Sequence, residues 1–110
     1  MSRTDFDLVR GDTFKKRLTF QDANEDPIDV SGYTFAGQVR ADPDDEEALA
    51  DFTFDTTDAA DGIVDAIIAP EDTADFPFPY VHYDIQYTDD NGVVTTAPRG
   101  RLRMIKDVTR

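Results

Sequence analysis

The chain has 110 residues, no cysteine, one histidine and a formal net charge of −13. A chain of this length forms one domain that buries about 65% of its unfolded surface, and the lack of cysteine excludes a disulfide framework and a thiolate metal site. Its first residues lack the apolar core of a signal peptide and no run approaches the roughly 18 apolar residues of a membrane span, so we expect a soluble protein made in the cytoplasm.

The first third of the chain alternates apolar and polar residues, as half-buried strands do. This pattern predicts strands over residues 6–10, 13–20 and 33–40. Lys16 interrupts the apolar row of the second strand, and its long side chain can reach water from the rim of a sheet. Gly37 lies in the apolar row of the third strand. A glycine there indicates close packing by a large residue from the facing sheet, or a bulge.

The middle of the chain contains one helix-like piece and one two-sided strand. Residues 43–49 are acidic and begin with a proline, which favours a short helical excursion on the surface, although one or two turns alone are marginally stable. A further strand is expected over 51–55. Residues 63–68 are apolar on both faces, with Ile63 and Ile67 on the second face. That face requires cover from another subunit or from a crossing loop.

The last third of the chain contains a predicted hairpin. Residues 80–88 alternate with the two-residue period of a strand, and the following turn ends in Asn-Gly, which tolerates the positive φ angles of a tight hairpin. Residues 93–96 then return antiparallel, and a further run over 100–104 alternates again. About seven short strands without a long helix predict an all-β fold, an antiparallel immunoglobulin-like β-sandwich that forms a single domain over 1–110. A small barrel is the alternative.

The inventory of side chains disfavours catalysis. One histidine, His82, two serines and no cysteine cannot supply a nucleophile together with a base and an orienting group, and among 24 acidic residues carboxylate pairs arise by chance. We therefore expect no enzyme and no cofactor. Acidic clusters at 42–47 and 89–92 offer oxygen ligands for Ca²⁺ or Mg²⁺, but neither matches the calcium-loop pattern, so solvated loops are expected rather than a metal site.

The charges are unusual in type and in distribution. Asp supplies 20 of the 24 acidic residues and Arg 8 of the 11 basic ones, which is typical of a halophilic cytoplasm or a virus of one; an ordinary acidic surface is the alternative. Residues 1–40 carry six basic and seven acidic side chains, residues 41–98 carry none and 16, and residues 99–110 carry five and one. The carboxyl end is therefore a basic patch on an acidic body.

This basic patch is a weak candidate for binding nucleic acid, because it lacks interleaved aromatic residues and the rest of the chain repels phosphate. A contact with another subunit or with a protein partner is more consistent with the charge separation, and an internal balance with neighbouring strands is the alternative. The predicted interface combines the two-sided strand with the basic end: Ile63, Ile67, Arg99, Arg101, Arg103, Lys106 and Arg110.

Several short phrases occur in an order that suggests a family: LVRGDTF at 8–14, PIDVSGYTF at 27–35 leading into QVR, YDIQ at 83–86, and Gly100 with DVT at 107–109. Together they resemble the small β-sandwich domain of structural proteins of tailed viruses, and are similar to the amino-terminal domain of phage baseplate upper proteins and related tail-fibre attachment modules. The resemblance covers most of the chain outside 41–75. The Asp-rich surface would suit a haloarchaeal virus.

The resemblance implies a virion component, assembled in the host cytoplasm, that oligomerises and docks onto a tail or baseplate ring formed by other virion proteins. The coiled coil or receptor-binding domain that follows in that family is missing from this sequence, which favours an adaptor. A capsid decoration protein is one alternative. A carbohydrate- or ion-binding module is another, and Phe76, Phe78 and Tyr80 are the aromatic residues outside the predicted inward rows that could form its platform.

Overall fold

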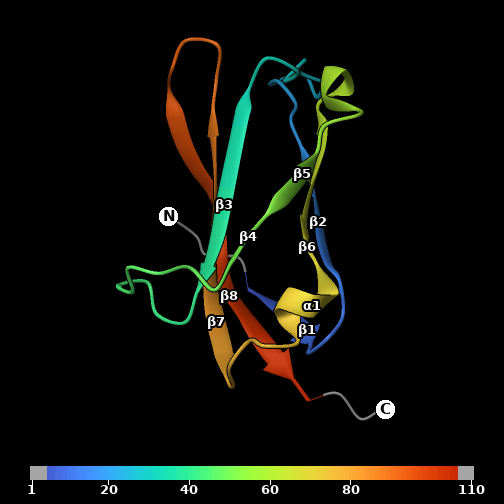
Figure 1. Cartoon of the computed structure of the whole chain (residues 1–110). Coiled ribbons are helices and arrows are strands. Elements are labelled where there is room, and N and C mark those ends of the chain that lie inside the picture. Colours follow the sequence, from blue (N-terminus) through green and yellow to red (C-terminus); the bar gives the residue numbers. More distant parts are fainter. Residues whose placement is uncertain (1–4, 107–110) are drawn as a thin grey trace.

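The computed structural model describes residues 5–106, which form two β-sheets packed face to face (Figure 1). The strands are β1 (Phe6–Val9), β2 (Phe14–Thr19), β3 (Thr34–Arg40), β4 (Ala50–Asp51), β5 (Thr53–Asp55), β6 (Ile63–Ile68), β7 (Tyr80–Thr88) and β8 (Val94–Ile105), and the helical turns are η1 (Ala59–Asp61) and α1 (Pro70–Thr73). The larger sheet has the order β1-β8-β7-β3-β4 and the smaller one the order β2-β6-β5.

This strand order is that of an immunoglobulin-like sandwich and confirms the predicted fold class. Strands β2, β6 and β5 occupy the positions of strands B, E and D, and β3, β7 and β8 those of C, F and G, with β4 as the additional strand C′. One pair departs from the antiparallel expectation, because β1 runs parallel to β8. A turn at Gly11, with φ at +89°, then takes the chain across to β2 in the smaller sheet.

The core lies between the sheets and is rich in aromatic rings. Val81, Tyr83 and Ile85 of β7 are buried, as the two-residue period predicted. Phenylalanine and tyrosine rings from both sheets contact one another along the sandwich, namely Phe6, Phe14, Phe20, Tyr33, Phe35, Phe52, Phe54, Tyr83 and Tyr87. At the rim, the Lys16 ammonium lies 5.1 Å from the centre of the Phe6 ring, which confirms that this lysine extends from the inward row toward the sheet margin.

The predicted strand over 51–55 is instead the point where the chain changes sheets. β4 belongs to the larger sheet and β5 to the smaller, and between them the Phe52 N–H donates to the Gly37 carbonyl at 2.9 Å. A Cβ atom on Gly37 would lie 2.8 Å from Cδ2 of Phe52. The Phe52 ring therefore requires glycine at 37, which confirms the expected close packing there.

The two runs predicted at 93–96 and 100–104 are parts of one strand, β8. The register pairs Gln86 with Thr96 but Asp84 with Arg99, so one residue of β7 faces two of β8. Such a bulge shifts the alternation of inward and outward side chains by one residue. The sequence pattern is interrupted at that point although the strand continues.

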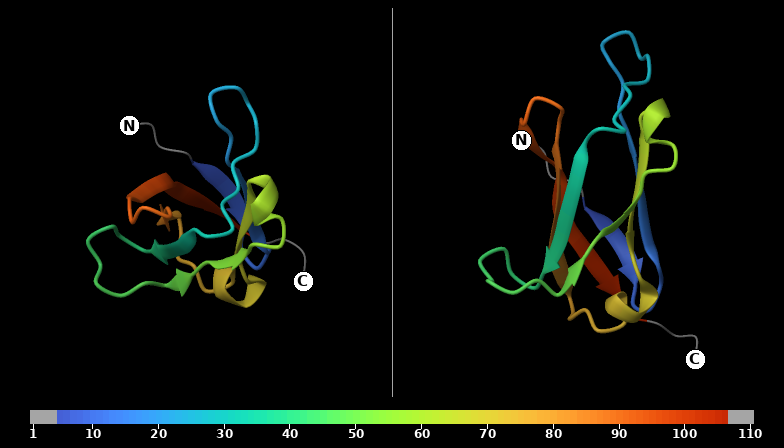
Figure 2. Two further views of the ribbon diagram at one scale, coloured as in Figure 1. Left: turned by 90° about the horizontal axis from the view of Figure 1, so that it is seen from above. Right: turned by 45° about the horizontal axis from the view of Figure 1, so that its top comes forward.

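The acidic excursion over 43–49 is present on the surface, but it is not helical (Figure 2). The Asp44 N–H donates to Asp42 Oδ1 at 3.0 Å, and the Asp42 N–H donates to Asp45 Oδ2 at 3.2 Å. These carboxylates take up amides that a helix would otherwise use, which is why aspartate favours turns over helix interiors. The described helical segments, η1 and α1, are three and four residues long, and neither has the length or apolar character of a membrane span.

Candidate interaction face of the larger sheet

The outer face of the larger sheet carries columns of charged side chains, one column per strand. In the lower half of this face, the column at β1 consists of Asp5 and Asp7, and the column of β8 consists of Arg99, Arg101 and Arg103. The column of β7 consists of Tyr80, His82 and Asp84, that of β3 of Gln38 and Arg40, and β4 contributes Asp51. Four arginines and four aspartates thus share this face. Its local charge is balanced, whereas the whole chain carries −13.

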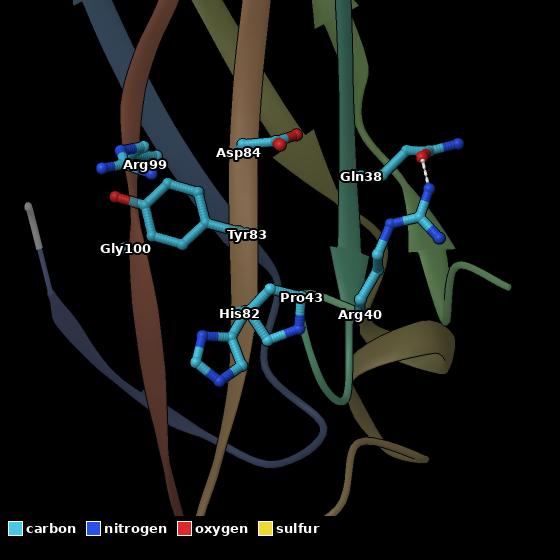
Figure 3. A pocket seen from close by; sticks show the side chains of 8 residues that line it. All are labelled: Gln38, Arg40, Pro43, His82, Tyr83, Asp84, Arg99 and Gly100. Atoms are coloured by element: carbon cyan, nitrogen blue, oxygen red, sulfur yellow. Dashed lines mark hydrogen bonds between the residues drawn. The ribbon is translucent and has the colours of Figure 1, made fainter. Parts of the chain in front are cut away.

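A shallow hollow of about 330 Å³ lies on this face (Figure 3). It is lined by Gln38, Arg40, Pro43, His82, Tyr83, Asp84, Arg99 and Gly100. On the β3 side, the Arg40 guanidinium donates to Gln38 Oε1 and to the Asp45 carbonyl, the latter at 2.8 Å. Arg40 is therefore held in place by its own strand and by the acidic excursion. The hollow offers both donors and acceptors to a polar partner.

Tyr83 forms part of the hollow and part of the core. Its side chain is 4% exposed, and burial, together with the charge of Asp5, raises the pKa of its phenol to about 12. The phenol is therefore protonated at neutral pH and can donate a hydrogen bond there but cannot serve as a base.

The basic residues of β8 differ in their pairing. Arg101 contacts Asp5 through an ion pair of 3.5 Å and through its backbone N–H at 2.9 Å, and Arg103 lies 4.0 Å from Asp7. The internal balance that the sequence left open thus applies to these two arginines. Arg99 is exposed, and its side chain makes no hydrogen bond or ion pair within residues 5–106.

Lys106 is likewise exposed, without a polar contact in the described part of the chain. Arg110, together with the DVT phrase at 107–109, lies outside the described residues.

The structure places Ile63 and Ile67 on the opposite side of the sandwich, on the outer face of β6. Both are half-buried, and Asp65 lies between them with only 6% of its surface exposed. Arg17 of β2 donates to both oxygens of Asp65 at 3.0 and 3.3 Å, and the Lys15 ammonium lies 3.5 Å away. The two-sided strand is therefore flanked by long side chains of the same subunit.

This arrangement fixes the ionisation of Asp65. The hydrogen bonds from Arg17 lower the pKa of the Asp65 carboxyl, and the charges of Arg17 and Lys15 lower it further, against the opposing effect of burial. Ile63 and Ile67 thus flank a buried carboxylate whose two cationic partners are exposed, and the structure does not bring these isoleucines together with the arginines of β8. The predicted interface residues form two separate surfaces.

The aromatic residues considered for a ligand platform have different environments. Phe76 is buried in the core with 2% of its surface exposed. Phe78 and Tyr80 are exposed, but Arg10 lies 5.0 Å from the centre of the first ring and Arg101 lies 4.6 Å from that of the second. These two rings are engaged in cation–π contacts.

The acidic loops use carboxylates to stabilise turns. Asp89 Oδ1 accepts the N–H groups of Asn91 and Val93 at 2.9 and 3.0 Å, and Asp42 has the same role in the 43–49 excursion. Within the range 5–106, no three acidic or histidine side chains converge as metal ligands would.

Comparison with models of known protein families and with curated protein sequences finds no match. The pairing of Arg101 and Arg103 with the two aspartates at the start of the chain is the feature that sequence reasoning missed. No local signal announces it, because the partners lie almost a full chain length apart.

Proposed function

We propose that this protein is a non-enzymatic structural component of a tailed virus, an adaptor that assembles with copies of itself and docks other tail or baseplate proteins. The outer face of the larger sheet is the observation that supports this most directly. Its side chains alternate in charge from strand to strand, and Arg99 on it has no partner within the described residues. A partner protein that presents the opposite charge to each of these columns would neutralise the face and dock in one orientation.

The assignment to a virion draws its support from the sequence resemblance. The phrases at 8–14, 27–35 and 83–86 correspond to the β1–β2 turn, the approach to β3 and the centre of β7, which are positions that define the sandwich. The Asp-rich composition supports a halophilic host, because short hydrated carboxylates keep a protein soluble in concentrated salt. On this proposal the partners are other virion proteins and the final location is the virion.

The decisive experiment locates the protein. Virions from the culture that carries the gene are purified and separated into heads and tails, and each fraction is examined by quantitative mass spectrometry. Enrichment with tails supports the adaptor. Enrichment with heads would instead support a capsid decoration protein, and absence from purified virions would refute the viral assignment.

A binding experiment tests the face itself. Purified tails that lack the protein are mixed with the wild-type chain, with Arg99→Asp and with Lys106→Asp, which changes the net charge equally from outside the hollow. We expect Arg99→Asp to weaken co-sedimentation by about tenfold or more and Lys106→Asp to leave it nearly unchanged. Equal effects of the two variants would show that overall charge, rather than this face, governs docking.

A further inference from the structure

Two exposed turns of this chain share one design. The first spans residues 22–26, between the two sheets, and the second spans residues 89–93, at the tip of the β7–β8 hairpin; we call them the amino-terminal turn and the hairpin turn. Figure 2 shows both as loops that project from the same end of the sandwich. Each begins with an aspartate and has an asparagine at its third position, Asn24 and Asn91, the two asparagines of the chain.

The hydrogen bonds of the two turns correspond one by one. In the hairpin turn, Asp89 Oδ1 accepts the N–H groups of Asn91 and Val93 at 2.9 and 3.0 Å. The Asp89 carbonyl accepts the Gly92 N–H at 3.1 Å. In the amino-terminal turn, Asp22 accepts the N–H groups at the same three positions, at 2.8, 3.1 and 3.0 Å. In both turns the first residue donates its own N–H to the carbonyl of the fifth, so one framework holds both asparagines.

The turns differ in the residue that follows the asparagine. It is Glu25 in the amino-terminal turn, with φ at +65°, and Gly92 in the hairpin turn, with φ at +81°. Both lie in the left-handed region, so the backbone is alike, and both turns are exposed at these positions. Apart from its chain neighbours, no described heavy atom lies within 4 Å of the place where a Cβ on Gly92 would stand. The backbone after Asn91 is therefore uncrowded, whereas the backbone after Asn24 carries a side chain.

This difference matters because an asparagine side chain can react with the backbone that follows it. The next backbone nitrogen loses its proton to water or hydroxide, bonds to Cγ of the asparagine and expels the side-chain nitrogen as ammonia, which leaves a five-membered succinimide ring. Water then opens the ring. Opening at Cγ gives aspartate, and opening at the main-chain carbonyl gives isoaspartate, in which the chain continues through the side chain. A side chain on the attacking residue hinders the approach of its nitrogen, and glycine does not.

We propose that Asn91 is a site of spontaneous deamidation, with water as the co-reactant, and that opening of the hairpin turn sets its rate. In the closed turn the attacking nitrogen of Gly92 keeps its proton in the hydrogen bond to the Asp89 carbonyl. The nitrogen must leave this bond before it reacts, so the carboxylate of Asp89, which holds the turn closed, protects the asparagine. Asn24 has the same protection and, in addition, the hindrance of Glu25.

Deamidation would change the tip of the hairpin in charge and in shape. Residues 91–98 carry no charge in the unmodified chain, and either product adds a carboxylate there, close to Asp89 and Asp90. Isoaspartate also adds one methylene to the backbone path between Asp89 and Val93, the pair that closes the hairpin. The aspartyl product therefore keeps the turn, whereas the isoaspartyl product alters it. This inference goes beyond the proposed function and does not depend on it.

The first experiment exchanges the residues that distinguish the turns. Wild type, Glu25→Gly and Gly92→Glu are incubated at neutral and at mildly alkaline pH, and peptide mapping by mass spectrometry, with electron-transfer fragmentation, separates asparagine, aspartate and isoaspartate. We expect wild type to react at Asn91 and not at Asn24, Glu25→Gly to react at both, and Gly92→Glu to react at neither. The rate should rise in proportion to hydroxide, because the attacking nitrogen must lose a proton.

The second experiment tests the protection by the turn. Asp89→Ala removes two side-chain hydrogen bonds and should speed deamidation of Asn91 in the folded chain by about tenfold. Asp29→Ala is the matched control, because it removes the same charge and the hydrogen bonds of a different turn, those from Ser31, and it should react at the wild-type rate. In urea that unfolds every chain, wild type and Asp89→Ala should react equally fast, since no turn remains.

Three outcomes would overturn the proposal: a folded wild-type chain in which Asn91 reacts no faster than Asn24, a Glu25→Gly variant in which Asn24 stays intact while Asn91 reacts, or folded wild type and Asp89→Ala reacting at one rate. A difference between the last two chains that persists in urea would likewise refute the role of the turn. Near-ultraviolet circular dichroism verifies that each variant is folded. The exchange at residue 25 keeps its force if Asp89→Ala fails to fold.

Discussion

Replacement of Gly62 by alanine provides a stringent test of how the ends of the smaller sheet are packed. Gly62 follows η1 with φ at +75°, and its carbonyl accepts the Phe20 N–H at 2.8 Å. A Cβ atom there would lie 2.5 Å from the Phe20 carbonyl oxygen and 2.9 Å from that of Ile28. Both obstacles are backbone atoms, so no side-chain rotation can relieve the contact.

Two costs add for Gly62→Ala. Holding alanine in the left-handed region costs about 1–2 kcal/mol, and forcing apart three closely packed backbones costs about 1–3 kcal/mol more, so we expect a loss of about 3 kcal/mol. Gly11→Ala is the matched control, because Gly11 also has a positive φ, +89°, but nothing lies within 4 Å of its Cβ position. It should lose only the conformational cost, about 1 kcal/mol.

Equilibrium urea unfolding of the wild-type chain and both variants measures these losses, provided the denaturant slopes remain equal. The expected difference of about 2 kcal/mol is a large part of the total stability of a small domain. If Gly62→Ala and Gly11→Ala lose the same amount, the close approach of Phe20 and Ile28 to Gly62 is wrong.

Three further predictions concern ionisation and salt. Because Arg17 lowers the pKa of Asp65, the stability that this carboxylate contributes is present above the ordinary aspartate pKa of 3.8 and is lost as the pH falls below it. The urea midpoints of wild type and Asp65→Asn should therefore differ at neutral pH and converge in acid. A difference that stays constant with pH would refute this. Burial raises the pKa of Tyr83 to about 12, so the stability that the protonated phenol contributes is complete below pH 10 and is lost as the pH rises through 12. Ultraviolet titration should show a phenol that ionises near pH 12, and this step should be absent in Tyr83→Phe. Potassium chloride should raise the melting temperature by screening the charge of −13, and a flat calorimetric series would contradict the halophilic interpretation.

The sequence predicted well those features of the fold that depend on local pattern. Period-two alternation identified the buried face of β7, Asn-Gly identified its hairpin with β8, and the missing side chain of Gly37 indicated the close approach that Phe52 makes. Each of these signals lies within a few residues of the structure it predicts.

The errors arise where distant segments meet or where local polar contacts prevail. Phe52 and Phe54 both contribute to the interior on either side of the crossing between sheets, so their alternation conceals that crossing. The parallel pairing of β1 with β8 joins the two ends of the chain, and a period-two pattern contains no information about the partner of a strand. In the acidic excursion, carboxylates of Asp42 and Asp45 accept backbone amides, which outweighs the weak helical preference.

The sequence predicted only part of the candidate interface, again because the rest depends on which strands pair with one another. The outward arginines of β8 are where the alternation places them, whereas the apolar second face of β6 leads the sequence to predict cover from another subunit or from a crossing loop. Asp65 changes that interpretation, because the register of β2 places Arg17 directly opposite it. Without the register, the sequence could not show that a carboxylate between two isoleucines has a cation across the strand pair to neutralise it.

The distribution of charge has a consequence for how copies of such an acidic chain can meet. Most surfaces of two approaching molecules repel, because residues 41–98 carry 16 acidic side chains and no basic one. The outer face of the larger sheet is a region where this repulsion is locally cancelled, because four arginines and four aspartates share it. Repulsion elsewhere then selects the orientation of encounter as effectively as attraction does at the contact. Strong screening by salt would remove part of this selectivity while it weakens the overall repulsion.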